Sequence, residues 1–139
     1  MTTETANVDI LKHAYQQWAD KKAEDITCWM SIVADDARLT SLAEGAAGVA
    51  FTRARSGKSD ILEYLKGLTA DWEMLFYRVD EYIAQGDRVV ALGSTSWRNK
   101  TTGKVMVTPK VDIWRMKNGK VVQFSEFYDT IRLIEAATV

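Results

Sequence analysis

Apolar residues recur at helical spacing in the N-terminal half of the chain. The first stripe follows Asn7, a residue type that favours the N-cap, and consists of Val8, Leu11, Ala14, Tyr15 and Trp18. A second, short helix is expected at about residues 24–33. A third begins at Lys58 or Ser59 and is expected to bury Ile61, Leu62, Leu65 and Leu68. The pattern therefore predicts three helices before the β-rich part of the chain.

From Trp72 onward the apolar residues recur with a period of two, which is typical of β-strands. This period predicts four long strands, at residues 72–83, 88–98, 104–117 and 120–129. The last two flank Asn118-Gly119, where both residues tolerate the positive φ of a tight hairpin turn. The shorter elements that we expect are strands at 38–42 and 51–55, a loop at 43–50 and a closing helix at 131–136.

Strict alternation about the Asn118-Gly119 turn divides the last two strands into two faces. One face carries Lys110, Asp112, Trp114, Phe124, Glu126 and Tyr128. The other carries Val111, Ile113, Val121 and Phe127. We expect the first face to be concave and to line a pocket. The second, convex face would be an exposed apolar patch, so we expect it to pair with a second copy of the chain in a homodimer.

Three helices followed by long antiparallel strands predict an α+β fold. The expected form is a cone-shaped α+β barrel, with three N-terminal helices packed on a curved, mainly antiparallel β-sheet. Such a cone has an apolar, half-open interior, and small-molecule pockets form in concavities of this kind. The 139 residues are enough for one domain spanning 1–139, and no repeat or linker divides them.

The charge balance argues against several classes of function. With 18 basic and 19 acidic side chains the net charge is −1, so we expect no nucleic-acid partner. No apolar run is long enough to cross a membrane and the first residues lack a signal-peptide pattern, so we expect no membrane partner and a cytoplasmic location. One histidine and one cysteine are too few for a metal site built from His and Cys ligands, and no metal or other cofactor is expected.

Asp112 is the most unusual residue of the hairpin, because Asp is depleted in strands that are rich in Val, Ile and Trp. Glu126 has the same facing in the adjacent strand, so we expect the two carboxyls to be cross-strand neighbours. In a dry pocket their repulsion would keep one protonated as an acid and leave the other as a base. A protonated Asp112 would favour an anionic ligand such as a phenolate. The alternative is a solvated network of Lys110, Asp112 and Glu126 at the mouth of the cone.

Aromatic side chains supply the rest of the candidate pocket. Tyr15 lies in the apolar stripe of the first helix, so it is either a donor in the pocket or a core residue with a satisfied hydroxyl. The residues expected to contact a small apolar or aromatic ligand are Trp18, Trp29, Lys110, Trp114, Phe124 and Tyr128. The alternative for these aromatic residues is ordinary core packing.

Several local motifs occur in an order that resembles one group of known proteins. They are Tyr15 in the first helix, Asp35-Asp36-Ala37 after the second, Gly-Asp-Arg-Val-Val at 86–90, Val-Asp-Ile-Trp-Arg-Met at 111–116, Asn-Gly-Lys-Val at 118–121 and Glu-Phe-Tyr-Asp at 126–129. Together they resemble the SnoaL-like and ketosteroid isomerase-like branch of the nuclear transport factor 2-like superfamily. The resemblance covers almost the whole chain and implies the same cone-shaped fold, with pairing through the sheet common among its members.

The resemblance also implies roles for particular residues. Asp112 matches the isomerase strand position whose protonated carboxyl donates a hydrogen bond to the developing oxyanion, and Tyr15 matches that family's phenolic donor. Ser41 stands where the isomerase has its catalytic Asp, so the same proton transfer lacks its base. The Arg and Asp of epoxide hydrolases of this fold have no counterpart in residues 89–95.

We therefore expect a small-molecule pocket protein with general acid–base chemistry of the isomerase, cyclase or dehydratase type, acting on an apolar carbonyl compound. Asp112 would be the acid or oxyanion donor, Tyr15 a second donor and Glu126 the base. The alternative is a non-catalytic ligand-binding or dimerisation module of the same fold. An enzyme needs a base and a donor within hydrogen-bond reach of one ligand atom, whereas a binding module needs only the pocket.

Overall fold

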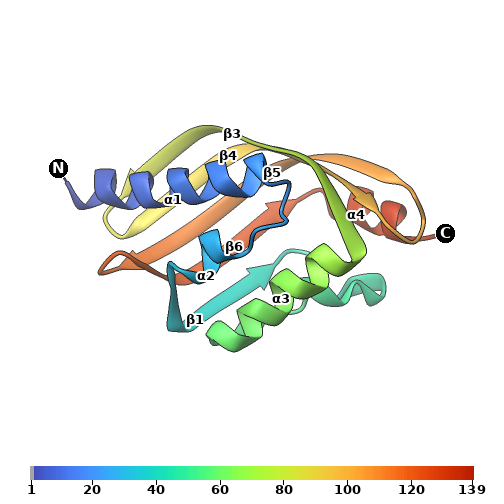
Figure 1. The fold of residues 1–139 in the computed structure, drawn as a ribbon, viewed down its shortest axis with the longest axis horizontal. Coiled ribbons are helices and arrows are strands. Elements are labelled where there is room, and N and C mark those ends of the chain that lie inside the picture. Colours follow the sequence, from blue (N-terminus) through green and yellow to red (C-terminus); the bar gives the residue numbers. More distant parts are fainter. Residues whose placement is uncertain (1) are drawn as a thin grey trace.

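Residues 2–139 are described by a computed structural model, and within them lie four α-helices and a six-stranded sheet (Figure 1). The helices are α1 (Thr3–Asp20), α2 (Thr27–Met30), α3 (Lys58–Asp71) and α4 (Thr130–Ala137). The strands are β1 (Val33–Ser41), β2 (Arg55–Ser56), β3 (Trp72–Gln85), β4 (Arg88–Asn99), β5 (Val105–Lys117) and β6 (Lys120–Tyr128). Two 3-10 segments, η1 (Ala46–Gly48) and η2 (Ala50–Thr52), connect β1 to β2.

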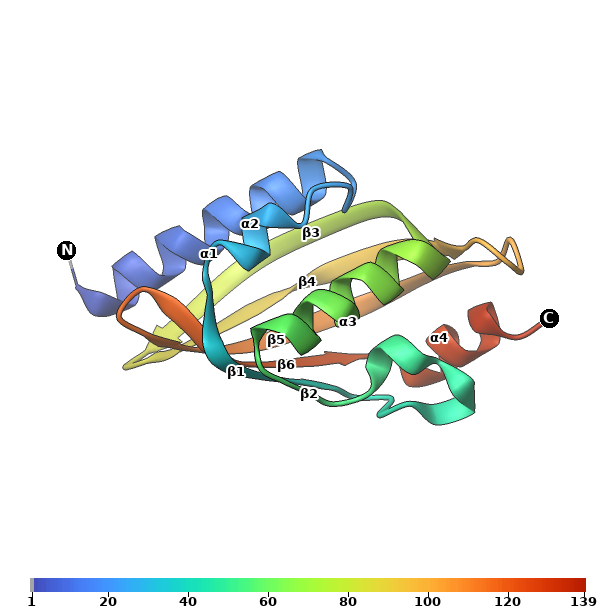
Figure 2. The ribbon, with the colours of Figure 1, turned by 60° about the horizontal axis from the view of Figure 1, so that its bottom comes forward.

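The sheet has the strand order β2-β1-β6-β5-β4-β3. Neighbouring strands are antiparallel except for β1 and β6, which run parallel. The helices α1 and α3 cross the same face of the sheet (Figure 2), where α1 packs against β3 and β4 and α3 packs against β1. The last helix, α4, packs against β4 and β5 near the C-terminal end of the chain. The predicted cone-shaped α+β fold is therefore confirmed.

The hairpin between β5 and β6 forms at the predicted turn. Asn118 and Gly119 have φ values of 51° and 75°, as a tight turn between twisted strands requires. Beyond a one-residue register shift near the turn, Asp112 pairs with Glu126 and Trp114 with Phe124, and these side chains share the inner face. The predicted division of the hairpin into two faces is correct for these residues.

Val121 is an exception to that division. It was expected on the convex face, but it is 1% exposed and lies on the inner side of the sheet. The reason is a β-bulge, because Arg115 pairs with Gln123 while Met116 pairs with Val121, which leaves Val122 as an extra residue in β6. One extra residue reverses the facing of everything on the turn side of the bulge. The convex apolar patch therefore does not include Val121.

Two expectations for the N-terminal segment are wrong. The N-cap of α1 is Thr2, whose side chain accepts from the Thr5 amide, and Asn7 is a buried residue inside the helix. The second helix is limited to α2, since Asp25 accepts from the Thr27 amide just before it and Val33 already pairs with β6. The expected short strand at 38–42 is thus the second half of a longer strand, β1.

Two further expectations fail around α3. The strand expected at 51–55 is limited to β2 at Arg55–Ser56, because Thr52 Oγ1 bonds locally to the Val49 carbonyl and the Gly45 amide and holds η2. In α3 the buried stripe contains Tyr64 where Leu62 was expected, and Leu62 is only partly buried. Tyr64 thereby reaches the interior of the cone.

Candidate functional site

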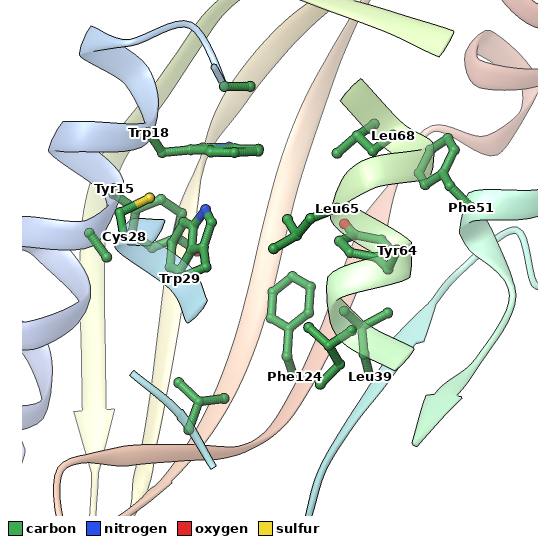
Figure 3. Close-up of a cluster of buried hydrophobic side chains, with 14 of the residues drawn as sticks. Tyr15, Trp18, Cys28, Trp29, Leu39, Phe51, Tyr64, Leu65, Leu68 and Phe124 are labelled. Atoms are coloured by element: carbon green, nitrogen blue, oxygen red, sulfur yellow. The ribbon is translucent and has the colours of Figure 1, made fainter. Parts of the chain in front are cut away.

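A cavity of about 90 Å³ lies between the helices and the concave face of the sheet. Figure 3 shows Trp18 and Trp29 on the α1 side pointing toward Tyr64, Leu65 and Leu68 on α3. The inner face of β5 and β6 forms the polar wall, through Lys110, Asp112 and Glu126. An apolar protein cavity of about 150 Å³ is known to bind benzene, so this smaller cavity suits a ligand more compact than benzene.

All nine residues predicted for the site line this cavity. They are Tyr15, Trp18, Trp29, Lys110, Asp112, Trp114, Phe124, Glu126 and Tyr128. The aromatic members pack against one another as well as facing the cavity. Trp29 stacks on Trp114 with ring centroids 5.2 Å apart, and the ring centroids of Phe124 and Trp114 are 4.2 Å apart. They therefore belong both to the core and to the cavity wall.

Asp112 accepts three short hydrogen bonds although only 2% of its surface is exposed. Tyr15 and Tyr77 each donate their hydroxyl to Oδ2, at 2.5 and 2.6 Å. Lys110 Nζ donates to Oδ1 at 2.6 Å. A buried carboxyl is thus matched by two neutral donors and one cation, which is the environment that stabilises its charged form.

The directions of these hydrogen bonds follow from groups that can only donate. The indole N–H of Trp114 donates to Tyr15 Oη at 2.8 Å, and the ammonium of Lys110 donates to Tyr77 Oη at 3.1 Å. Each phenol therefore uses its own proton on Asp112. With both phenols and Lys110 donating to it, Asp112 acts as a carboxylate acceptor and not as the proton donor that was expected.

Lys110 joins the two carboxylates. Its Nζ lies 2.6 Å from Asp112 Oδ1 and 3.1 Å from Glu126 Oε1, and the residue is 9% exposed. Burial alone would lower the pKa of Lys110, but the negative charges of Asp112 and Glu126 and the nearby phenols raise it well above its usual value. The network is therefore the ionic one that was considered as the alternative, but it is buried and not solvated.

Glu126 is held by one of its two oxygens. Oε1 accepts a hydrogen bond from Tyr64 Oη at 3.0 Å and forms an ion pair with Lys110. Oε2 is buried and, among the described residues, has no hydrogen-bond partner. An unpaired buried acceptor costs free energy, so such an atom is a natural contact for a ligand. Glu126 is thus the member of the cluster that retains an unused acceptor.

The tyrosines of the cluster remain neutral donors. Burial and then the charge of Asp112 raise the pKa of Tyr15 and of Tyr77 well above its usual value. Burial and the charge of Glu126 do the same for Tyr64. At ordinary pH these three phenols hold their protons and donate them to the carboxylates.

Tyr64 and Tyr77 are the cluster members that the sequence reasoning missed. Tyr64 carried a signal, because it completes the spacing i, i+3, i+4, i+7 with Ile61, Leu65 and Leu68. Tyr77 lies on the inner face because the register between β3 and β4 shifts between Met74 and Phe76. A bulge of this kind is not visible in the alternation of a single strand.

Ser41 has a structural partner in Tyr128. It is 1% exposed, and its hydroxyl lies 2.5 Å from Tyr128 Oη, which also accepts from the Ala43 amide.

Within residues 2–139 no group of three His, Cys, Asp or Glu side chains is arranged to hold a metal ion. In the same range, no helix is both long and apolar enough to span a bilayer.

Comparison with known proteins agrees with this geometry. The profile of the SnoaL-like domain matches residues 11–124, which is most of the chain. The chain belongs to the SnoaL-like family. No curated protein sequence matches this SnoaL-like chain.

Solved structures share the whole fold of the SnoaL-like chain at low sequence identity. An NTF2-like protein from Burkholderia xenovorans LB400 has a TM-score of 0.81 and 20% identity, with 99% of this chain and 100% of that chain covered. An NTF2-like protein of unknown function from Burkholderia pseudomallei K96243 has a TM-score of 0.81 and 21% identity, with both chains fully covered. TerC, co-crystallized with polyporic acid, has a TM-score of 0.77 and 23% identity, with 94% of this chain and 97% of that chain covered.

Proposed function

We propose that this SnoaL-like domain binds a compact, largely apolar carbonyl compound in its cavity and acts on it by general acid–base chemistry, with Glu126 as the base. The observation that supports this most directly is the free oxygen of Glu126. Oε2 belongs to a cavity-lining carboxylate and has no partner among residues 2–139, while Oε1 is held by Tyr64 and Lys110. A base must be both held in place and free to receive a proton.

The proton transfer proposed for Glu126 is simple. The Oε2 lone pair takes a proton from carbon next to the carbonyl, and the electron pair of that C–H bond becomes an enolate. The protonated carboxyl then returns the proton to the same or another carbon, so the reaction class is isomerisation or a related step. Asp112 has a positioning role here, since it anchors Lys110, Tyr15 and Tyr77.

A non-catalytic binding module is the second candidate, and a specific observation favours it. In the described structure, each donor of the cluster already has a carboxylate partner, so an enolate oxygen would need to displace one of these bonds. TerC, which shares the fold, was co-crystallized with a small molecule, and this supports the use of the cavity for binding under either candidate.

Proton exchange distinguishes the two candidates. Acetone and 2-butanone, two small ketones, would be incubated with the protein in D2O, and loss of the protons next to the carbonyl would be followed by NMR. We expect exchange at least about 100-fold above buffer for one of them, as general base catalysis allows. Glu126→Gln, which keeps the shape but loses the base, should abolish the enhancement.

Glu63→Gln is the matched control, because Glu63 is an exposed carboxylate on α3. This variant should retain the exchange rate of the unmodified protein. Saturable binding of either ketone without exchange above buffer would contradict the enzyme proposal and would favour the binding module.

A further inference from the structure

The charged groups of the cavity do not cancel. Among the described residues that line it, the ionisable acids and bases other than tyrosine are Lys110, Asp112 and Glu126. Asp112 accepts hydrogen bonds from Tyr15, Tyr77 and Lys110, as a carboxylate does. Glu126 accepts a hydrogen bond from Tyr64 and forms an ion pair with Lys110. One ammonium between two carboxylates leaves a net charge of −1 in the cavity wall.

The remaining negative charge has an identifiable location. Asp112 uses both oxygens on donors, whereas Glu126 Oε2 is buried and lacks a donor within the described part of the chain. Burying a charged oxygen without a hydrogen bond is unfavourable. A ligand that brings a donor and a positive charge satisfies both requirements at once, while an anion would add a second uncompensated charge.

The aromatic walls also suit a cation. Lys110 Nζ already lies 5.4 Å from the ring centroid of Tyr77 and 5.7 Å from that of Phe124. Both distances fall within the range in which the negative face of an aromatic ring attracts a cation. Trp29, Trp114 and Tyr64 add further aromatic surface around the same space.

We propose that the preferred ligand of this cavity is a small organic cation with N–H donors, of the amidinium or ammonium class, whose nitrogen is bound by Glu126 Oε2. This inference goes beyond the proposed function, because a cation bound at Oε2 would occupy the oxygen that the proposed proton transfer uses and would compete with a carbonyl substrate. The expected preference for a phenolate, which depended on a protonated Asp112, is thereby reversed.

Isosteric ligand series test this inference on the unmodified protein. Acetamidinium, acetamide and acetate have nearly the same shape but charges of +1, 0 and −1, and benzamidinium, benzamide and benzoate repeat the comparison with a ring. Binding at pH 7 would be measured by calorimetry and by the fluorescence of Trp18, Trp29 and Trp114, which line the cavity. We expect the cation of at least one series to bind roughly 10- to 100-fold more tightly than its amide, the range for a hydrogen bond to a charged group.

Glu126→Gln provides the matched variant. It should remove most of the advantage of the cation and leave the affinity of the amide within about threefold, while Glu63→Gln changes neither, since an exposed charge contributes little. If Glu126→Gln fails to fold, the comparison of cation, amide and anion on the unmodified protein still decides the question.

The outcomes separate this inference from the proposed function. Tighter binding of an anion than of its cation, or equal binding of cation and amide, would overturn the cation preference while leaving a working pocket. Ketone exchange that depends on Glu126, without any cation preference, would do the same. Absence of binding by all six compounds, together with absence of ketone exchange, would count against both proposals.

Discussion

Lys110→Met is the substitution that most directly tests the buried network. Lys110 Nζ lies between Asp112 and Glu126, which are cross-strand partners on the inner face of β5 and β6. Methionine fills a similar volume but removes the ammonium. The two carboxylates would then face each other in a site where they are 2% and 4% exposed.

The expected loss of stability is large. Removing one partner of a buried ion pair costs about 3 to 5 kcal/mol, because the remaining charge is left without compensation in a poorly solvated site. For a chain of this size that corresponds to a fall in melting temperature of roughly 10 to 17 °C. Total stabilities of single domains are about 5 to 15 kcal/mol, so the variant should remain folded only marginally or with a reduced folded fraction.

A double-mutant cycle identifies repulsion as the cause. Urea unfolding at pH 7 would compare Lys110→Met, Glu126→Gln and the double variant, with Lys66→Met as control because Lys66 is exposed on α3. In the Lys110→Met background, Glu126→Gln removes one of the two facing charges. It should therefore restore stability there, with a coupling of about 1 to 3 kcal/mol, typical of residues in direct contact.

Two results would refute this reasoning. One is a loss for Lys110→Met no larger than that of Lys66→Met, which should lie within about 0.5 kcal/mol of the unmodified protein. The other is that Glu126→Gln changes the free energy of unfolding equally in the unmodified protein and in the Lys110→Met variant. Either would mean that the two carboxylates do not depend on the ammonium, and that the network does not carry the charges assigned to it.

Two further predictions concern alkaline pH and assembly. Each of the five tyrosines of the sequence has a raised pKa, with burial the main cause, and that of Tyr82 and Tyr128 is about 12. Because the folded-state pKa exceeds that of the unfolded phenol, about 10, this contribution to stability is full below pH 10 and is lost as the pH rises further. The free energy of unfolding measured with urea should fall from pH 9 to 11, and phenolate absorbance should appear only as the protein unfolds. Phenolate absorbance near pH 10 in the folded protein would contradict this. The chain is also expected to be a homodimer through the convex face, where Val105, Val107 and Phe127 are exposed, and Val111→Lys should convert it to a monomer in sedimentation equilibrium. A monomer at micromolar concentration before substitution would refute the dimer.

The fold could be predicted because its signals are local and repeated. The Asn118-Gly119 turn brings β5 and β6 together, and alternation assigns Lys110, Asp112 and Trp114 to the inner face. The turn alone would pair Asp112 with Ser125, but the bulge at Val122 shifts the register by one residue and places Asp112 opposite Glu126. The turn was therefore sufficient to predict the hairpin but not the pairing across its polar wall.

The errors arise where an element depends on a distant partner. The facing of Val121 depends on an extra residue at Val122, which only the pairing with β5 reveals. The early end of the second helix depends on β1 pairing with β6, since Val33 already pairs with Val121. The role of Asp112 as an acceptor depends on Tyr77 and Trp114. Only the three-dimensional arrangement shows that Tyr77 donates to Asp112 and that Trp114 donates to Tyr15, which leaves Asp112 as the acceptor for the Tyr15 proton.

The proton transfer proposed for Glu126 does not need the base that the resemblance to the isomerase implies. That base would stand at Ser41 on β1, where the side chain is instead hydrogen bonded to Tyr128. In the parallel ladder Ser41 is paired with Glu126, so the neighbouring strand carries a carboxylate at the same level. Adjacent strands are only about 4.8 Å apart, a distance that the longer Glu side chain can span. Because Tyr64 and Lys110 hold one oxygen of Glu126 and leave the other free, the carboxylate on β6 has both properties that a base on β1 would have supplied.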